Sequence, residues 1–489
     1  MSKPNRDLTR IRHNTKIVAT LGPGSNDVNL LEDMIRIGGL NVVRFNFSHG
    51  TAEFHQENAR IVREAAQRAG QEVAIMADLQ GPKIRVGKLV NGAIELNAGE
   101  KLLLDAAHEG EGTRERVGLD YRDLPNDVKA GDVLLLDDGL LTLIVDSVNG
   151  SEILTTVQNS HKLKSNKGIN KQGGGLSAGA LTEKDFRDLK TAIGIGCDYL
   201  AVSFVKSAED LKIARDLVEA EMQGKDAVRP GLVSKIERVE AIENLDEIIK
   251  ASDGIMVARG DLAVEVGNAA VPALQKRMIK RARELRRFTI TATQMMESMI
   301  TNPVPTRAEV SDVANAVLDG TDAVMCSAET AVGAYPFETV RQMAVICAAA
   351  EAEQDSLNGV DEAHQTEPVN TNLAISGGAV YVARAVNAKA IVALTESGST
   401  AFEISRHSIQ LPIYALTPSV SAQRRMAMYR GVRPIMLATS KDHDTAIGEV
   451  ETMLVDRKVL LSGDQYIITS GSQMRESGST NMLQVMEVH

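Results

Sequence analysis

Several residues suited to phosphate, carboxylate or metal chemistry stand at the ends of short β-branched runs in this chain. Lys235 and Glu237 are two positions apart in GLVSKIE, and Asp261 closes the next run, GIMVARGD. If the two runs are neighbouring strands, the carboxylates of Glu237 and Asp261 meet and form a site of hard oxygen ligands suited to Mg²⁺ or Mn²⁺. The Lys235 ammonium beside them would stabilise developing negative charge. This arrangement predicts a metal-assisted reaction.

A second group of candidates would hold an anion and a reacting hydroxyl near that centre. Gly260 and Asp261 follow a strand-like run, and the free backbone N–H groups at such a helix start bind anions such as a carboxylate. Thr293 ends the run FTITATQ, where its hydroxyl could donate to a substrate oxygen or orient a water. The simpler alternative is that Asp261 only caps the helix that follows.

Basic and polar side chains end two further runs. In NVVRFNFSHG the side chains of Arg44, Asn46 and Ser48 share one face, and Arg44 suits bidentate contact with phosphate. The segment ADLQGPKIR adds three charged candidates, Asp78, Lys83 and Arg85. Surface ion pairing remains the structural alternative for the arginines. Repeated placement at the ends of runs favours one shared site.

Eight such runs must position these residues. Apart from one large gap they begin every 23 to 35 residues, with helix-like sequence between them. Eight buried parallel strands, each followed by a helix, form a (β/α)8 barrel whose active site lies at the carboxyl ends of its strands. We therefore predict such a barrel from the runs Lys16–Gly22, Asn41–Gly50, Val73–Gly81, Tyr199–Phe204, Gly231–Glu237, Gly254–Asp261, Phe288–Gln294 and Ala323–Thr330.

The gap after the third run predicts an inserted domain. Residues 86–180 contain short β-rich pieces separated by Gly, Asn and Asp turns, which indicates a small all-β domain between strand 3 and helix 3. Its exit, NKGINKQGGGLS, is basic and rich in glycine; it is either a hinge or a plain flexible linker. The barrel helix resumes with a capping-box-like start at Thr182 and Asp185. The barrel is expected at residues 1–85 and 181–350.

Residues 351–489 predict a third unit, an open mixed α/β sheet of about five strands. Its first strand, KAIVALT, runs into ESGSTAFEISR, so a phosphate nest is expected at the start of a helix. An ordinary Ser/Thr helix cap is the alternative. The candidate effector residues are Thr395, Ser397, Gly398, Ser399 and Thr400.

Composition limits the classes of function. The net charge of −11 and the 3% aromatic content argue against a nucleic-acid partner. No apolar run reaches about 18 residues, so no membrane span is expected. The three cysteines, Cys197, Cys326 and Cys347, fit no paired zinc spacing and are expected as buried free thiols, as suits the cytoplasm.

The same segments carry a family resemblance. KIVATLGP, NVVRFNFSHG, GPKIR, KGIN, SKIE, VARGDL, TATQMMESM, PTRAEVSDVANAVLDGTDAVM and SAET resemble, in this order, the pyruvate kinases through nearly the whole chain. The resemblance implies phosphoryl transfer from phosphoenolpyruvate to ADP, giving pyruvate and ATP. It also implies a β-barrel lid, a C-terminal domain that binds a phosphorylated sugar or nucleotide effector, and a homotetramer.

By this resemblance, Lys235 corresponds to the catalytic lysine, and Glu237 and Asp261 correspond to the ligands of Mg²⁺ or Mn²⁺. The N–H groups of Gly260 and Asp261 would hold the substrate carboxylate, and Thr293 would help a water to protonate the enolate carbon. The residues that would contact phosphates or nucleotide are Arg44, His49, Arg85 and Lys167. The monovalent-cation cage would comprise Asn46, Ser48, Asp78 and the carbonyl of Leu79.

One departure from the family pattern concerns the monovalent cation. Many pyruvate kinases have Glu as the third residue of the segment that reads GPKIR here, where this chain has Lys83. In the family, that Glu marks dependence on K⁺, and Lys marks independence. An ammonium can supply the charge that the ion otherwise supplies. K⁺ is therefore expected not to be required. Ala328 replaces a common Gly and changes little.

Two other functions remain open from the residues alone. One is a different barrel enzyme that stabilises an enolate with Mg²⁺, such as an aldolase or lyase. The other is a metabolite-binding regulatory protein with an inactive barrel, which the intact set Lys235, Glu237 and Asp261 disfavours.

Overall fold

The computed structural model describes residues 9–224, 228–357, 370–407, 409–437, 443–471 and 480–489. Its centre is a closed barrel of eight parallel strands in the order β1-β16-β15-β14-β13-β12-β3-β2, which confirms the predicted (β/α)8 barrel. Every strand is almost fully buried, as continuous apolar runs require. The strands are β1 (Lys16–Thr20), β2 (Val42–Asn46), β3 (Ala74–Asp78), β12 (Tyr199–Val202), β13 (Gly231–Ile236), β14 (Gly254–Ala258), β15 (Phe288–Ala292) and β16 (Ala323–Cys326).

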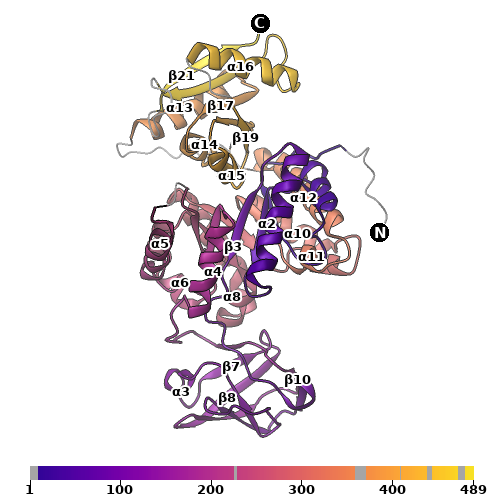
Figure 1. Cartoon of the computed structure of the whole chain (residues 1–489), viewed down its shortest axis with the longest axis vertical. Coiled ribbons are helices and arrows are strands. Elements are labelled where there is room, and N and C mark those ends of the chain that lie inside the picture. The colour runs from indigo at the N-terminus through magenta and orange to yellow at the C-terminus, as the bar shows by residue number, and fades with distance from the viewer. Residues whose placement is uncertain (1–8, 225–227, 358–369, 408, 438–442, 472–479) are drawn as a thin grey trace.

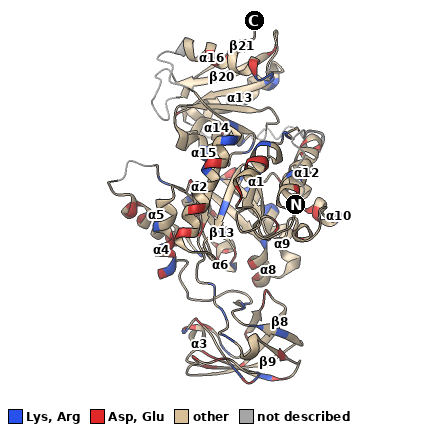
Figure 2. Ribbon diagram, turned by 45° about the vertical axis from the view of Figure 1, so that its right-hand side comes forward, with Lys and Arg blue, Asp and Glu red and all other residues tan. Residues whose placement is uncertain are grey.

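Helices surround the barrel and carry most of its charged residues (Figure 2). The predicted capping box is present at the start of α4, where Thr182 and Asp185 exchange side-chain and backbone hydrogen bonds. The longer helices are α2 (Ala52–Ala69), α4 (Glu183–Gly194), α5 (Ala208–Met222), α9 (Val271–Glu284), α10 (Arg307–Leu318) and α12 (Pro336–Leu357). The shorter ones are α1 (Val28–Asp33), α6 (Val239–Glu243), α7 (Leu245–Ala251), α8 (Arg259–Val266) and α11 (Ala328–Ala331), with a π-turn at Met34–Gly38 and 3₁₀ turns at Asn268–Ala270 and Glu297–Ile300.

The barrel strands end earlier than the apolar runs suggested. The segment Arg259–Val266 is helix α8, so Gly260 and Asp261 belong to the first turn of a helix that starts directly after β14. The first turn of a helix leaves its backbone N–H groups without intrahelical partners. This position is the one that an anion-binding role for Gly260 and Asp261 requires.

The inserted domain is a curled β structure at one end of the molecule (Figure 1). A six-stranded sheet has the order β11-β7-β8-β9-β5-β6, and β10 pairs with β4 beside it. The sequence did not indicate β6, β10 or β11; β11 lies inside the glycine-rich exit and pairs with β7. The elements are β4 (Ala93–Leu96), β5 (Lys101–Asp105), β6 (Arg116–Gly118), β7 (Val133–Leu136), β8 (Leu141–Asn149), β9 (Glu152–Val157), β10 (His161–Lys164), β11 (Ile169–Lys171), α3 (Leu124–Asp127) and a 3₁₀ turn at Val90–Gly92.

The C-terminal unit lies at the opposite end of the barrel from the insert (Figure 1). Its sheet has the order β19-β18-β17-β20-β21, with β21 antiparallel, which confirms the predicted mixed five-stranded sheet. Ala438 of the predicted third strand lies outside the described residues. The elements are β17 (Ala390–Leu394), β18 (Ile413–Thr417), β19 (Val432–Met436), β20 (Gln465–Gly471), β21 (Thr480–Glu487), α13 (Thr371–Ala385), α14 (Ser399–Ser405), α15 (Val420–Met426) and α16 (His443–Asp456).

The barrel interior and the C-terminal unit share one apolar core. Side chains from the barrel strands, such as Tyr199 and Phe288, belong to the same buried cluster as Ile404 and Met426 of α14 and α15. Polar contacts reinforce this contact surface, because Tyr199 donates its hydroxyl to the carbonyl of Arg425 at 2.7 Å. The C-terminal unit is therefore packed firmly against the end of the barrel.

Cys197, Cys326 and Cys347 are buried free thiols, as expected. Among the described residues, no helix combines the length and the apolar character that crossing a membrane requires.

Candidate active site

Lys235 lies at the centre of a buried charged network at the carboxyl ends of the barrel strands. Its ammonium Nζ is 2.9 Å from Glu237 Oε1 and 3.3 Å from Asp78 Oδ1, and it donates to Ser203 Oγ at 2.7 Å. Burial alone would lower the pKa of Lys235, but the charges of Asp78 and Glu237 outweigh burial and raise it. Lys235 therefore stays a cation and presents its charge at the mouth of the barrel.

Arg44 shares the carboxylate of Asp78 with Lys235. Its Nε donates to Asp78 Oδ2 at 2.6 Å, and its Nη1 donates to Thr20 Oγ1 at 2.9 Å. Burial would raise the pKa of Asp78, but the cations Lys235 and Arg44 outweigh that effect and lower it. Asp78 is thus an ionised anchor that orients two cations toward the same space.

The other residues of the predicted monovalent-cation cage lie beside this anchor. Asn46 Oδ1 accepts the backbone N–H of Ser48 at 3.1 Å, and the carbonyl of Leu79 accepts the hydroxyl of Ser203 at 2.6 Å. Asp78 itself faces the two cations described above. The structure therefore brings the cage residues together around β2 and β3.

Glu237 directly follows β13, and Asp261 lies in the first turn of α8, which begins where the adjacent strand β14 ends. Glu237 is buried and accepts the N–H of Phe204 at 2.8 Å. Burial raises the pKa of Glu237, Lys235 opposes this rise, and the neighbouring charge of Asp261 reinforces it. The negative charges of these two carboxylates repel each other. A cation that both contact would stabilise their ionised forms.

This donor set fits a magnesium ion. Mg²⁺ commonly takes one or two carboxylates and completes its shell with water and substrate phosphate, rather than with a cage of protein ligands. No cluster of three or more His, Cys, Asp or Glu side chains suited to a metal occurs among the described residues. The pair Glu237 and Asp261 therefore fits a metal that is held jointly with substrate.

Lys83 takes a place that the sequence did not suggest. Its ammonium lies 3.1 Å from Asp261 Oδ1 and 4.0 Å from Asp138 Oδ1 of the inserted domain. The contacts of the Asp78 carboxylate described above are with Arg44 and Lys235. In this structure the cation of Lys83 therefore faces a predicted metal ligand, on the side of the centre nearest the insert.

Thr293 and Gly260 contact each other directly. The N–H of Gly260 donates to Thr293 Oγ1 at 2.8 Å, and that hydroxyl donates to the carbonyl of Ala292 at 2.6 Å. Thr293 has φ +69° and Gln294 has φ +54°, so the chain leaves β15 in the left-handed region. Residues other than glycine rarely adopt this backbone conformation, and those that do are often found at functional sites.

The remaining predicted nucleotide contacts lie in other surroundings. Arg85 donates to the carbonyl of Asn166 at 3.0 Å, and Lys167 lies 2.7 Å from Asp137 within the inserted domain. The carbonyl of His49 contacts Nε2 of His55 at 3.0 Å. Arg85 and Lys167 thus contact residues of the insert in this structure.

The C-terminal candidates form a tight turn that leads into the first two residues of α14. Gly398 has φ +87°, and its N–H donates to Thr395 Oγ1 at 3.0 Å. Thr400 is buried, and its hydroxyl lies 2.6 Å from the hydroxyl of Thr480. Ser397 is exposed and Ser399 is half-buried, so these two are the hydroxyls most open to a ligand.

Sequence reasoning missed several residues that shape the centre. Ser203 bonds Lys235 and Leu79, Thr20 bonds Arg44, and Asp312 pairs with Arg259. Thr20 is the last residue of β1, and Ser203 directly follows β12. The predicted site residues occupy the same kind of position, so both could have been identified from the sequence. Asp312 lies on α10, and nothing in the local sequence connects it with Arg259.

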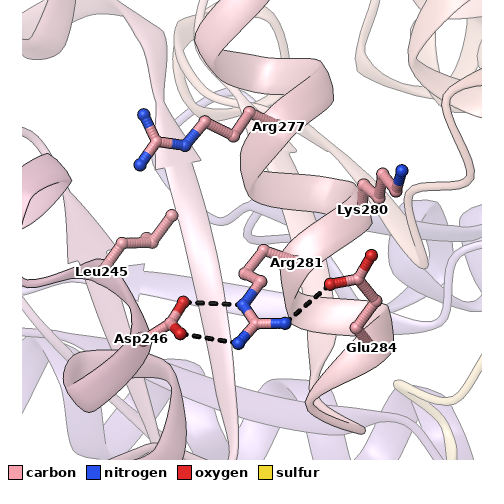
Figure 3. A pocket seen from close by; sticks show the side chains of 6 residues that line it. All are labelled: Leu245, Asp246, Arg277, Lys280, Arg281 and Glu284. Carbon is pink, nitrogen blue, oxygen red and sulfur yellow. Dashed lines mark hydrogen bonds and ion pairs between the residues drawn. The ribbon is translucent and has the colours of Figure 1, made fainter.

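Among the described residues, hollows occur on the outer face of the barrel and between the barrel and the insert. The larger, of about 350 Å³, lies on the outside between α7 and α9, where Arg281 bridges Asp246 and Glu284 (Figure 3). The smaller, of about 20 Å³, lies between the barrel and the insert, next to Lys83, Phe204, Arg238 and Glu265. Only the smaller one adjoins the charged network described above.

Comparisons with known proteins agree with this architecture. The family model of the pyruvate kinase barrel domain matches residues 12–340, and that of the pyruvate kinase alpha/beta domain matches residues 373–486. Pyruvate kinase II of Salmonella typhimurium is 51% identical over 98% of this chain and 100% of its own length. A pyruvate kinase of Buchnera aphidicola subsp. Acyrthosiphon pisum is 49% identical over the same shares.

A solved structure gives the same result at the level of the fold. The crystal structure of a pyruvate kinase from Cryptosporidium parvum superposes with a TM-score of 0.92 at 35% identity, covering 98% of this chain and 96% of the other. Both the sequence and the fold therefore match over nearly the full length. The chain belongs to the pyruvate kinase family, the glycolytic phosphotransferases that act on phosphoenolpyruvate and ADP.

Proposed function

We propose that Lys235 is the catalytic cation of this pyruvate kinase. The observation that carries the proposal is the position of its ammonium, which lies between Asp78 and Glu237 at the mouth of the barrel. During the reaction, the bond between phosphorus and the enol oxygen of phosphoenolpyruvate breaks, and a bond to a terminal oxygen of ADP forms. A fixed cation stabilises the charge that moves between these oxygens.

Arg44 would act beside Lys235 on the same phosphoryl group. Asp78 holds both cations in place and stays ionised, because their positive charges keep its pKa low. Glu237 and Asp261 would hold Mg²⁺ or Mn²⁺, which when bound supplies further charge neutralisation to phosphate oxygens. The protein then contributes positioning and electrostatics, the main requirements of phosphoryl transfer.

The enolate left by transfer needs a proton at its terminal carbon. Thr293 is the proposed residue for this step, since its hydroxyl sits at the end of β15 and can orient a water. The N–H groups of Gly260 and Asp261, in the first turn of α8, would bind the substrate carboxylate. In this structure the N–H of Gly260 donates to the hydroxyl of Thr293. A substrate carboxylate would have to displace that hydroxyl to bind the N–H of Gly260.

The insert, residues 86–180 in our proposed division of the chain, would close over the nucleotide. Arg85 and Lys167 stand at the insert, and His49 and Arg44 belong to the barrel. The exit of the insert contains Gly173, Gly174 and Gly175, all with positive φ, which suits a hinge. Closure would carry the positive charge of Lys167 toward the phosphates.

Lys83 bears on whether the enzyme requires a monovalent cation. We propose that Lys83 makes K⁺ unnecessary, because it places a permanent cation beside the metal ligand Asp261 at 3.1 Å. Lys83 pairs with Asp261 and not with Asp78 of the predicted cation cage, whose ion pairs are with Arg44 and Lys235. The positive charge is nevertheless held in the same centre, where it attracts anionic substrates.

The C-terminal unit is the proposed effector domain, with the turn from Thr395 to Thr400 binding a phosphorylated sugar or nucleotide. Support comes from the exposed position of Ser397 in this turn and from the contact of α14 with the barrel core. We also propose a homotetramer that works in the cytoplasm. The proposed boundaries of the remaining parts are 1–85, 181–350 and 351–489.

The catalytic role of Lys235 can be tested with Lys235→Met. A cation that acts in the transition state contributes to turnover more than to ground-state binding. We expect a loss of kcat by orders of magnitude and a much smaller change in the KM for phosphoenolpyruvate, in a coupled assay of pyruvate formation. Lys280→Met on the outer face of α9 is the matched control. Equal losses in kcat and in affinity would show a binding role instead.

A further inference from the structure

Arg259 is the best-anchored cation near the centre to which the proposed mechanism assigns no task. It is the first residue of α8, and its side chain is only 12% exposed. Its Nη1 and Nη2 lie 2.7 Å from the two carboxylate oxygens of Asp312, in a bidentate pair. A guanidinium held on one side by such a fork is fixed in plane and in orientation.

The other side of that guanidinium grips the end of β15. Its Nη2 donates to the carbonyl of Thr293 at 2.7 Å, and its Nε donates to the carbonyl of Ala292 at 3.2 Å. The neighbouring residue Gly260 donates its N–H to the hydroxyl of Thr293 at 2.8 Å. Two consecutive residues of α8 therefore hold Thr293 by both its backbone and its side chain.

This grip falls where the backbone needs support. Thr293 is β-branched and has φ +69°, and Gln294 follows it with φ +54°. A conformation of this kind costs on the order of 1–3 kcal/mol and persists only when surrounding contacts impose it. The bonds from Arg259 to the carbonyls of Ala292 and Thr293 are such contacts. They hold the backbone segment that carries the side chain of Thr293.

We infer that Arg259, fixed by Asp312, is a positioning residue for Thr293 in the proton-transfer half of the reaction. The inference rests on the proposed role of Thr293. Arg259 does not touch the reacting atoms in this account. It holds the hydroxyl that orients the water, and misplacement by about 1 Å can cost about 10²-fold in rate.

The test separates protonation from phosphoryl transfer. Exchange of the methyl hydrogens of pyruvate for deuterium from D₂O, followed by NMR with Mg²⁺ and inorganic phosphate, reports enolisation without transfer. For Arg259→Gln we expect exchange to fall about 10²-fold, because a glutamine cannot bond Asp312 and both carbonyls at once. The KM for phosphoenolpyruvate should change much less than the exchange rate. Arg259→Lys should lie between wild type and Arg259→Gln.

Two controls distinguish positioning from a general loss of structure. Arg281→Lys alters another bidentate arginine, the one that pairs with Asp246 on the outer helices (Figure 3), and should leave exchange unchanged. Asp312→Asn should reproduce part of the Arg259→Gln loss while phosphoenolpyruvate affinity is retained. Thermal melting of each variant verifies that the protein is folded.

A double variant gives the decisive result. If Arg259 acts through Thr293, then Arg259→Gln should cost little further exchange once Thr293→Val is present, since coupled residues are not additive. Full additivity, or normal exchange in a folded Arg259→Gln, would overturn the inference. If Thr293→Val alone keeps normal exchange, the proposed role of Thr293 is wrong, and the inference falls with it for that separate reason.

Discussion

The ammonium of Lys83 lies 3.1 Å from Oδ1 of Asp261, although 178 positions of sequence separate the two residues. Lys83 follows β3 at the entrance to the insert, and Asp261 lies in the first turn of α8 after β14. Lys83 also lies 4.0 Å from Asp138 in the insert. One lysine thus connects a proposed metal ligand with the domain that is proposed to close over it.

The first prediction concerns the metal. Asp261→Asn removes one of two carboxylates that would hold Mg²⁺, so activity should fall by orders of magnitude at saturating Mg²⁺. Titration of Mn²⁺ followed by electron paramagnetic resonance should show weaker binding, which is a readout independent of turnover. Asp246→Asn, in the outer hollow of Figure 3, is the matched control. Normal Mn²⁺ affinity in Asp261→Asn would remove this residue from the metal site.

The second prediction concerns the monovalent cation. The unmodified enzyme should keep near-full activity when K⁺ and NH₄⁺ are replaced by a large inert cation, because Lys83 already supplies positive charge. Lys83→Glu should make activity dependent on K⁺, since the new carboxylate beside Asp261 adds negative charge that an ion must balance. Lys206→Glu serves as the control. Strong activation of the unmodified enzyme by K⁺ would contradict the proposal.

The third prediction concerns pH and Glu265. Glu265 is buried, and burial raises its pKa from 4.5 to about 7, although its carboxylate accepts the N–H of Val239 at 3.0 Å. A raised carboxyl pKa means that the folded protein binds more protons than the unfolded chain between those two values. The free energy of unfolding should therefore fall as pH rises from about 4.5 to about 7.

Glu265→Gln keeps the shape of the side chain and removes its titration. Its free energy of unfolding, measured with urea at several pH values, should decline less between pH 5 and 7 than that of the unmodified protein. Glu284→Gln on the outer helix α9 is the control for a general effect of lost negative charge. Parallel pH profiles for Glu265→Gln and the unmodified protein would show that Glu265 does not titrate in this range.

The fourth prediction concerns the C-terminal turn. Ser399→Glu places negative charge at the start of α14, where it would repel a phosphorylated ligand. Any activation by a phosphorylated sugar or nucleotide should be lost, and basal activity should be retained. Thr400 is unsuitable for this test because it is buried and its hydroxyl contacts Thr480. Thr452→Glu on α16 is the control, and activation that survives in Ser399→Glu would place the effector elsewhere.

The sequence alone determined the barrel and the identity of its charged centre. Short continuous apolar runs rich in β-branched residues favour buried strands, and their even spacing leaves room for one helix each, so the sequence predicted the closed barrel. Lys235 and Glu237 lie two apart on β13, and Asp261 follows the next strand, so their convergence needed only strand order. The insert was predicted from the same spacing, because the interval between the third and fourth strand-like runs is much longer than the others.

Only the tertiary structure decided which partner each charge takes. Asp78 pairs with the two cations Arg44 and Lys235, and Lys83 pairs with Asp261. The distances between these side chains depend on how the strands and the insert pack, which the sequence spacing does not encode. Thr293 adopts a positive φ because Arg259 and Gly260 hold it, and Arg259 is itself held by Asp312 from another helix. Contacts between residues far apart in sequence depend on how whole elements pack, and local pattern carries no record of that packing.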